Sequence, residues 1–279
     1  MKPKIIVHCL VKNEERFIWY ALQSVLPFVD KVMAWDTGSS DKTIDLIKSI
    51  KSSKISLKEV GEVDQDTFTS MRQQMLDATP KDFTWVMILD GDEVWPKDSI
   101  KEVTGFAKQH PDYDSIVVRT NNLVGDIYHR LPESVGKYTL VGDTGHLALR
   151  FMNLKTIPGL NTQRPHGQQG YFDKQGTLVQ DRNPKKIKFI DVYYHHATHL
   201  VRSSSHQLDK QVIKRGFKLK YDLGRKVNKF QIPEVFFSKK PKIVPTVTQK
   251  ASLFFWIKSG VLTPLRFVKR IFFNKKQGY

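Results

Sequence analysis

The sequence predicts an α/β fold, in which a mostly parallel sheet is flanked by helices. Two observations lead to this prediction. Over residues 4–96, short apolar runs alternate with segments whose apolar residues recur every three or four positions, as strands and helices do in βαβ units. Polar residues directly follow several of the apolar runs, where the carboxyl ends of parallel strands would share one edge of the sheet.

The expected elements follow one another at short spacing. Strands are expected at residues 4–10, 31–35, 55–60, 85–89, 115–119, 146–153 and 186–194, and helices at 13–26, 41–50, 68–78, 97–109 and 203–223. Asn13 is the expected N-cap of the first helix, because Glu14 and Glu15 then lie in its positively polarised first turn. Residues 121–146 are rich in Gly, Asn and Asp, which indicates a hairpin or loop insertion over the site.

Three acids follow the strand expected at 85–89, in the tetrapeptide Asp90-Gly91-Asp92-Glu93. Asp90 and Asp92 can converge there on one divalent cation, and Gly91 would let a ligand approach the backbone. Magnesium takes one or two carboxylates and completes its shell with water and substrate phosphates, so the pattern indicates a metal that holds a diphosphate. An acidic surface turn is the alternative. Asn13 and Asp36 follow other strands at the same rim, which favours the ligand site.

The charge of the chain is concentrated at one end. Residues 201–279 hold 19 Lys or Arg against 3 Asp or Glu, whereas residues 1–200 hold 26 against 25, within a net charge of +17. This asymmetry indicates an anionic partner, either nucleic acid or an acidic membrane surface. The single cysteine excludes an internal disulfide framework. No uninterrupted apolar run reaches the length of a spanning helix or a signal peptide, so a cytoplasmic protein is expected.

The C-terminal residues are expected to form a separate unit, which divides the chain into a domain at 1–223 and an extension at 224–279. Residues 224–250 are expected as a basic linker. Residues 251–273 combine many aromatic and aliphatic residues with Lys and Arg, which suits a basic, amphipathic helix pair lying in an anionic membrane interface. A C-terminal helix docked on the domain is the alternative.

Four motifs carry a resemblance to a known family. They are Val11-Lys12-Asn13-Glu14-Glu15, Asp36-Thr37-Gly38-Ser39-Ser40-Asp41-Lys42-Thr43, Phe68 with Arg72-Gln73, and Leu89-Asp90-Gly91-Asp92-Glu93. In this order and spacing they resemble family 2 glycosyltransferases, in particular the branch resembling lipopolysaccharide-core glucosyltransferases. The resemblance implies a GT-A (Rossmann-like) fold, a nucleotide-diphosphate-sugar donor, a divalent metal (Mn²⁺ or Mg²⁺) and inversion at the anomeric carbon.

The resemblance also implies roles for single residues. Asn13 and Glu14 would lie near the nucleobase and Asp36 near the base or ribose. Asp90 and Asp92 would contact ribose, metal and diphosphate. Arg72 is either a phosphate-facing residue or an ordinary solvent-facing helical arginine.

The chain departs from the family pattern at three motif positions. Asp36-Thr37 stands where many members carry paired acids, and Arg72-Gln73 where the branch often has Arg-Asn. Gly167 stands where the family has a glutamate after a histidine, which puts the family's acidic candidate for general base in doubt. His166 is then the first candidate for the base, followed by Asp143 and Glu133.

Histidines 195, 196 and 199 follow the strand expected at 186–194. His196 is a candidate metal ligand, since the family often has a histidine after a late strand and imidazole suits manganese better than magnesium. A hydrogen-bonded histidine pair at a strand end is the alternative, and a zinc site is disfavoured because further ligands are missing nearby.

The expected function is metal-assisted transfer of a sugar to an acceptor hydroxyl on a lipid-linked or surface glycan, at the cytoplasmic face of a membrane. Nucleotidyl transfer would require a glycine-rich loop after the first strand, and residues 8–13 contain no glycine. A nucleic-acid-binding protein would interleave aromatic and basic residues, whereas the aromatics here gather in apolar clusters, so nucleic acid is an unlikely partner.

Overall fold

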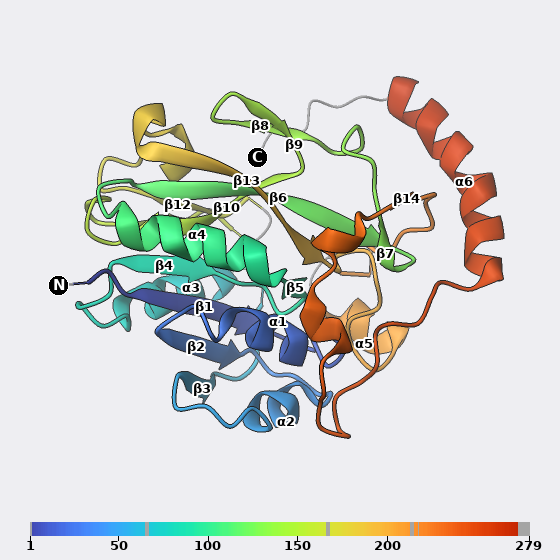
Figure 1. The fold of residues 1–279 in the computed structure, drawn as a ribbon, viewed down its shortest axis with the longest axis horizontal. Coiled ribbons are helices and arrows are strands. Elements are labelled where there is room, and N and C mark those ends of the chain that lie inside the picture. Colours follow the sequence, from blue (N-terminus) through green and yellow to red (C-terminus); the bar gives the residue numbers. More distant parts are fainter. Residues whose placement is uncertain (1, 65–66, 166–167, 213–214, 217, 273–279) are drawn as a thin grey trace.

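A computed structural model describes residues 2–64, 67–165, 168–212, 215–216 and 218–272. One mixed sheet runs through the molecule with helices on both faces (Figure 1). Its first four strands are β1 (Ile5–Val11), β2 (Lys31–Asp36), β3 (Ile55–Glu59) and β4 (Trp85–Ile88). They lie side by side in the order β4-β1-β2-β3, all parallel. This part confirms the predicted α/β fold and places the ends of β1, β2 and β4 at one edge.

The second half of the sheet is mainly antiparallel. Strand β10 (Leu147–Asn153) pairs antiparallel with β4 and with β6 (Ser115–Val124). Beyond β6 lie β7 (Asp126–Arg130) and β14 (Arg225–Lys226). The long strand β13 (Ile187–His196) pairs parallel with β6 and antiparallel with the short strand β5 (Glu93–Val94). Two small hairpins, β8 (Tyr138–Leu140) with β9 (Asp143–Gly145) and β11 (Asn161–Gln163) with β12 (Gly170–Phe172), stand apart from the sheet.

Both faces of the sheet are covered, which explains why every residue of β1 is buried and all but His8 are apolar. Ile5, Val7 and Cys9 join the larger core, to which α1 (Ile18–Val25), α2 (Thr43–Lys48) and α4 (Lys97–Gln109) contribute. Ile6 and Leu10 belong to a second core, to which α3 (Thr67–Asp77) contributes Met75. Successive residues of a strand point to opposite faces, so each side of β1 meets its own core.

The first predicted helix boundary is wrong. Helix α1 begins at Ile18, not after Asn13, and Phe17 is its N-cap residue. Asn13 has a φ of 53° and its side-chain oxygen accepts a hydrogen bond from Ser40 N at 2.8 Å. The asparagine therefore ties two loops together, a role open to it because asparagine tolerates the left-handed conformation.

The helix predicted at 203–223 is also wrong. Only α5 (His206–Gln211) is helical there among the described residues, and Ser205 caps it by accepting from Leu208 N. Downstream, Arg215 donates to the carbonyls of Lys12 and Asn13. These contacts hold the chain against the end of β1, which an outward-facing helix would not allow. Residues 121–146 were predicted as a hairpin or loop insertion, and hairpins are found there. Strand β6 continues to Val124 and β7 pairs back on it, and β8 with β9 forms a second hairpin.

Residues 224–250 pack on the sheet rather than forming an open linker. Val227, Phe236, Val244 and Val247 are buried in the larger core, and Tyr20 donates a hydrogen bond to Pro245 O at 2.7 Å. The helix pair expected at 251–273 is a single helix, α6 (Leu253–Phe272), with Pro264 inside it. The described residues include no helix with the length and hydropathy required to cross a membrane. The division at residue 223 stays a prediction.

Candidate active site

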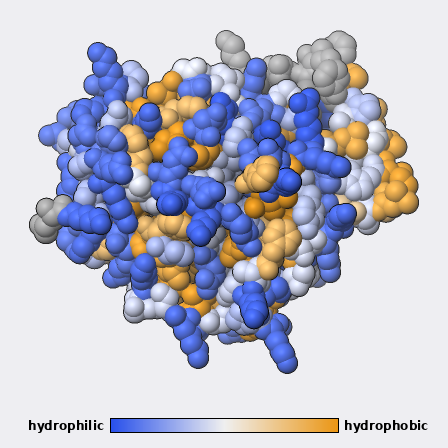
Figure 2. All heavy atoms as spheres, viewed as in Figure 1, coloured by the Kyte–Doolittle hydropathy of each residue, from blue (hydrophilic) through white to orange (hydrophobic). Residues whose placement is uncertain are grey.

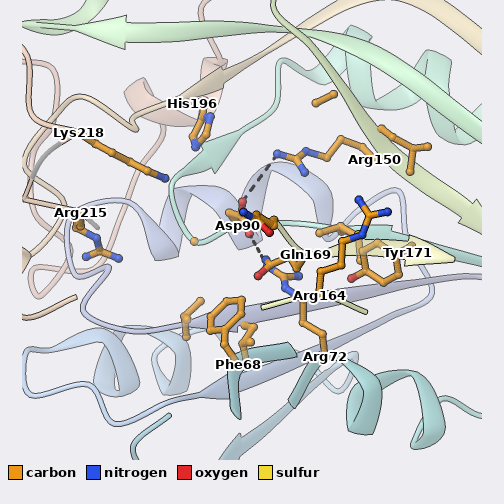
Figure 3. A pocket seen from close by; sticks show the side chains of 18 of the residues that line it. Phe68, Arg72, Asp90, Arg150, Arg164, Gln169, Tyr171, His196, Arg215 and Lys218 are labelled. Atoms are coloured by element: carbon orange, nitrogen blue, oxygen red, sulfur yellow. Dashed lines mark hydrogen bonds and ion pairs between the residues drawn. The ribbon is translucent and has the colours of Figure 1, made fainter. Parts of the chain in front are cut away.

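A cavity of about 1010 Å³ opens where β1, β2 and β4 end. Its floor includes Lys12, Thr37 and Asp90, the first polar residues after or near these three strands. Arg150 of β10 and His196 of β13 also line it. Side chains from both halves of the sheet thus point toward Asp90 (Figure 3), as expected at the carboxyl edge of an α/β sheet.

The acidic tetrapeptide divides into one accessible acid and two buried ones. The side chain of Asp90 is 35% exposed, whereas those of Asp92 and Glu93 are fully buried behind it. Gly91 is required by packing, since a Cβ there would lie 2.7 Å from Glu14 Cγ. Gly91 is therefore needed for close packing against the neighbouring loop, and its role in a ligand's approach stays a prediction.

Each of these acids has a cationic neighbour. Asp90 Oδ1 lies 3.2 Å from Arg72 Nη2, and its other oxygen is 3.8 Å from Arg150 Nη2. Asp92 Oδ2 lies 2.7 Å from Arg202 Nη1, and Glu93 is paired with Arg150. A carboxylate this deeply buried is costly unless it is paired, and these arginines supply the counter-charge.

The pKa values of the acids differ in direction. Burial opposes ionisation of Asp90, but the guanidinium groups of Arg150 and Arg72 outweigh it and hold the pKa of Asp90 well below its usual range. For Glu93 burial dominates and raises its pKa to about 8, against the effect of Arg150. At neutral pH Asp90 is therefore a full anion on the cavity surface, which is the state a metal or a ribose hydroxyl requires.

His196 completes a group that could hold a metal ion. Ligand atoms of Asp90, Glu93 and His196 lie within 4.8 Å of one another, and His196 Nε2 is 3.5 Å from Asp92 Oδ2. Burial lowers the pKa of His196 to about 4, although Asp92 and Asp90 act in the opposite direction. The imidazole is therefore neutral at pH 7 and can offer a lone pair.

Glu93 was missed as a member of this group. Its partner in the register of β5 and β13 is His196, so the two residues meet through a strand pairing across about a hundred residues of chain. The alternation of β13 gives His195 the opposite environment: it is fully buried, with Nε2 3.2 Å from Ile127 O. The predicted choice of His196 over His195 agrees with this placement.

The cavity is strongly basic. Among the described residues that line it, seven are Lys or Arg, against the two acids Glu14 and Asp90. The seven are Lys12, Arg72, Arg150, Arg164, Arg202, Arg215 and Lys218. Such an excess of positive charge fits a ligand that carries phosphate groups. Arg72 lies among them, so its predicted phosphate-facing role is compatible with its position, and it is not a solvent-facing arginine (Figure 3).

Three of these cations come from the segment after β13. Arg202 pairs with Asp92 and lies 3.3 Å from Glu14, and Arg215 also pairs with Glu14. Lys218 reaches toward Asp90 and His196 (Figure 3). The basic composition of residues 201–279 predicted an anionic partner, but it did not predict that Arg202, Arg215 and Lys218 line the cavity.

Of the residues predicted near the nucleobase, one lines the cavity and two are buried in the loops beside it. Glu14 lines the cavity, whereas Asn13 and Asp36 are buried and do not. Asp36 Oδ1 accepts hydrogen bonds from the backbone N–H groups of Gly38 and Ser39 at 3.0 and 2.9 Å. Asp36 therefore shapes the turn after β2, and its contact with a nucleotide stays a prediction.

Of the three candidates for general base, the two that lie among the described residues do not line the cavity. Glu133 and Asp143 lie within 3.5 and 4.0 Å of Arg119 and are absent from the described cavity wall. His166 and Gly167 lie outside the described residues. The assignment of the base to His166 stays a prediction.

The chain matches the model of one protein family, described as glycosyl transferase family 2, over residues 7–167. This match spans more than half of the chain and contains all four motifs. The chain belongs to glycosyl transferase family 2. Comparison with functionally characterised proteins by sequence gave no match.

Solved structures show a distant likeness in fold. The structure of S. aureus TarS residues 1–349 is 14% identical, with 76% of this chain and 65% of that one covered and a TM-score of 0.44. For a longer TarS structure the chain covers only 43% of its length. Glucosyl-3-phosphoglycerate synthase from Mycobacterium tuberculosis, in complex with Mn²⁺, uridine-diphosphate-glucose and glycerol 3-phosphate, is 15% identical, with 70% and 72% covered and a TM-score of 0.47.

Proposed function

We propose that this family 2 member transfers a sugar from a nucleotide-diphosphate-sugar to an acceptor hydroxyl, assisted by Mn²⁺ or Mg²⁺. The observation that carries the proposal is the juxtaposition in one cavity of an ionised Asp90, a neutral His196 and seven cationic side chains. Carboxylate and imidazole are ligands for a divalent ion, and the surrounding cations suit a diphosphate. A nucleotide-diphosphate-sugar carries a diphosphate that can bind both a divalent ion and cationic side chains.

The residues present fit a metal ion. The converging group consists of Asp90, Glu93 and His196, and Asp92 lies 3.5 Å from His196. We propose Asp90, Asp92 and His196 as the ligands. Asp92 Oδ1 is buried and has no hydrogen-bond partner among the described residues, which leaves a ligand atom to be satisfied. When bound, the metal would neutralise charge on the leaving diphosphate. Three side chains orient this arrangement: Arg202 holds Asp92, while Arg72 and Arg150 hold Asp90.

The cations have a separate part in the proposed reaction. As the bond between the sugar and the diphosphate breaks, negative charge grows on the diphosphate oxygens. Arg202, Arg215 and Lys218 would stabilise that charge by charge-assisted hydrogen bonds. Glu14 would meet the nucleobase, with Asn13 and Asp36 supporting the loops around it. His166 is the proposed base for the acceptor hydroxyl.

The finer identity of the reaction is also part of the proposal. We propose a hexosyl donor and inversion at the anomeric carbon, as in the branch that resembles lipopolysaccharide-core glucosyltransferases. The acceptor would be a lipid-linked or surface glycan. The protein would work in the cytoplasm, peripherally on the cytoplasmic face of a membrane, which the basic composition of residues 201–279 supports.

A thermal-shift screen of nucleotide-sugars with and without Mn²⁺ tests the proposal. A ligand that binds the folded chain raises its apparent stability by mass action, about 2.7 kcal/mol when its concentration is a hundred times Kd. We expect at least one nucleotide-sugar to raise Tm only when Mn²⁺ or Mg²⁺ is present, and Asp90→Asn to weaken that shift. If every nucleotide-sugar left Tm unchanged with either metal, the proposal would be wrong.

A further inference from the structure

Exposed large hydrophobic residues occur in only one part of the described chain. All ten of them lie between residues 223 and 268. Six belong to α6, with exposed fractions from 50% to 76%: Leu253, Phe254, Ile257, Val261, Leu265 and Val268. Figure 2 shows hydrophobic atoms gathered at the right edge of the molecule, where Figure 1 draws α6. Scattered single apolar residues are normal on a protein surface, whereas a continuous row of this kind marks an interaction site.

These six residues form one face of the helix. With 100° between successive residues of an α-helix, they lie within an arc of about 120°. The opposite face holds α6 on the domain. Phe255 packs on Tyr221 with ring centroids 5.4 Å apart, and Trp256 packs on His129 at 4.6 Å. Gly125 makes room for Phe255, since a Cβ there would lie 2.6 Å from its ring.

Polar contacts fix the same inner face. Arg266 donates to Tyr221 O at 2.6 Å and lies 3.2 Å from Asp222, while Thr263 Oγ1 accepts from Leu223 N. Ala251 N, just before the helix, donates to the buried carboxylate of Asp126. Helix α6 is therefore docked through its polar and aromatic side, so that its outward aliphatic side cannot be the face that packs on the domain. The two sequence-based alternatives, a docked helix and a membrane-facing helix, are compatible in one arrangement.

The sequence from residue 224 through α6 is cationic. Between residues 224 and 268 the chain has nine Lys or Arg and a single acid, Glu234. Six of these cations are exposed: Arg225, Lys226, Lys229, Lys239, Lys242 and Lys250. Phe230 and Phe237, 80% and 60% exposed, precede the helix and are not part of its outward face. Apolar residues flanked by cations match the two layers of an anionic bilayer surface, the acyl boundary and the charged headgroups.

We propose that the outward face of α6 is a docking surface for an anionic lipid bilayer, on which the helix lies parallel to the membrane plane. Aliphatic and aromatic side chains of that face would enter the headgroup region, and the cations nearby would bind the lipid phosphates. A second copy of this chain is a poorer occupant, because the contact would bring together two segments that each carry nine cations and one acid.

Docking would bring the membrane near the cavity through a short connection. Tyr221 and Asp222, which α6 contacts, lie three and four residues after Lys218 of the cavity wall. The lipid-binding inference does not depend on the proposed sugar transfer. Vesicle binding and donor binding are separate readouts, so that either can fail while the other holds.

Vesicle co-sedimentation of the full chain tests the surface. The wild type should pellet with phosphatidylcholine vesicles that contain phosphatidylglycerol, bind poorly to pure phosphatidylcholine, and be partly released by salt. The variant Phe254→Ser/Ile257→Ser/Leu265→Ser should lose about tenfold or more of its partitioning, because it removes apolar burial but no charge. Its Tm should stay near that of the wild type, since these side chains are 60–69% exposed and belong to none of the core clusters.

A matched variant places three serines on exposed apolar residues outside the helix, as Phe230→Ser/Phe237→Ser/Ile243→Ser. It should retain more than about half of the binding if α6 is the docking surface. Equal pelleting of the wild type and the α6 variant would overturn the proposal. Failure of the wild type to bind anionic vesicles would overturn it as well. If the wild type formed dimers and the α6 variant did not, the face would be a contact with a second copy, and the proposal would be wrong.

Discussion

The two sides of the cavity differ in chemistry and in origin. The sheet edge supplies acids, Glu14 after β1 and Asp90 after β4, with Asp92 buried behind them. The segment after β13 supplies cations, among them Arg202 and Lys218. Acids on a regular edge are placed by the strands that precede them. Arg202 and Arg215 reach the site from irregular backbone and are placed by the acids they pair with.

This difference teaches how the site is assembled. Arg202 joins Asp92 and Arg215 joins Glu14, so the later segment closes over the earlier one through buried ion pairs. Both partners of each pair are nearly inaccessible to solvent. Removing one partner of such a buried pair strongly lowers the free energy of unfolding, because the other charge is left unpaired. The account predicts that Asp90 and Asp92 act on the metal, while Arg202, Arg215 and Lys218 act on the diphosphate and the two arginines also stabilise the closed segment.

The largest expected effect is on the acid side. Asp92→Asn removes the charge of a proposed metal ligand and should lower metal-dependent donor turnover by more than about 100-fold. Steady-state rates with Mn²⁺ measure it. Asp173→Asn is the matched control, because Asp173 is also buried and paired, with Arg182, but lies outside the cavity wall. Undiminished turnover of Asp92→Asn would remove Asp92 from the metal site.

The next effect is on the cation side and concerns stability. Arg202→Gln leaves Asp92 buried without its partner, which should lower the free energy of unfolding by about 3–5 kcal/mol. Because Asp92 is then free, Mn²⁺ should raise Tm more in this variant than in the wild type. Chemical denaturation with and without Mn²⁺ measures both. If Mn²⁺ stabilised the two proteins equally, Arg202 and the metal would not share Asp92.

The smallest effect tests whether the two sides unfold together. Burial lowers the pKa of His8 in β1 and of His199 in the later segment to about 3 each. The unfolded chain therefore binds protons between pH 6.5 and 3 that the native chain does not, and the free energy of unfolding falls as pH decreases through this window.

Single glutamine variants separate the contributions of these histidines. If the ion pairs of Arg202 and Arg215 join the two sides into one cooperative unit, both His8→Gln and His199→Gln should reduce the loss of stability between pH 7 and pH 5. Urea denaturation at the two pH values measures it. A reduction in His8→Gln alone would mean that the later segment opens independently of the sheet.

The same comparison explains what the sequence could predict. Strands β1 to β4, helix α4 and the acids at Asp90 and Asp92 follow from local patterns, because strand, turn and acid lie within a few residues. The residues Glu93, Arg202 and Lys218 were not assigned to the site. Glu93 meets His196 only through strand pairing, and Arg202 is brought in by contacts with Asp92 and Glu14, about one to two hundred residues earlier in the chain.

Two errors of the sequence-based prediction have a shared physical reason. Residues 203–223 carry helical spacing and Asn13 has the residue type of an N-cap, so local propensity favoured helix at both places. The structure instead uses Arg215 to bind the carbonyls of Lys12 and Asn13, and the left-handed Asn13 to hold the loop at Ser40. Tertiary contacts overrode propensity where the site is built.

Anomalous diffraction from crystals grown with Mn²⁺ and a nucleoside diphosphate tests the central claim most directly. The account predicts one manganese peak among Asp90, Asp92 and His196, and a diphosphate between that peak and the side chains of Arg202 and Lys218. A nucleoside diphosphate in the cavity with manganese bound elsewhere, or with its phosphates pointing away from both cations, would contradict the account.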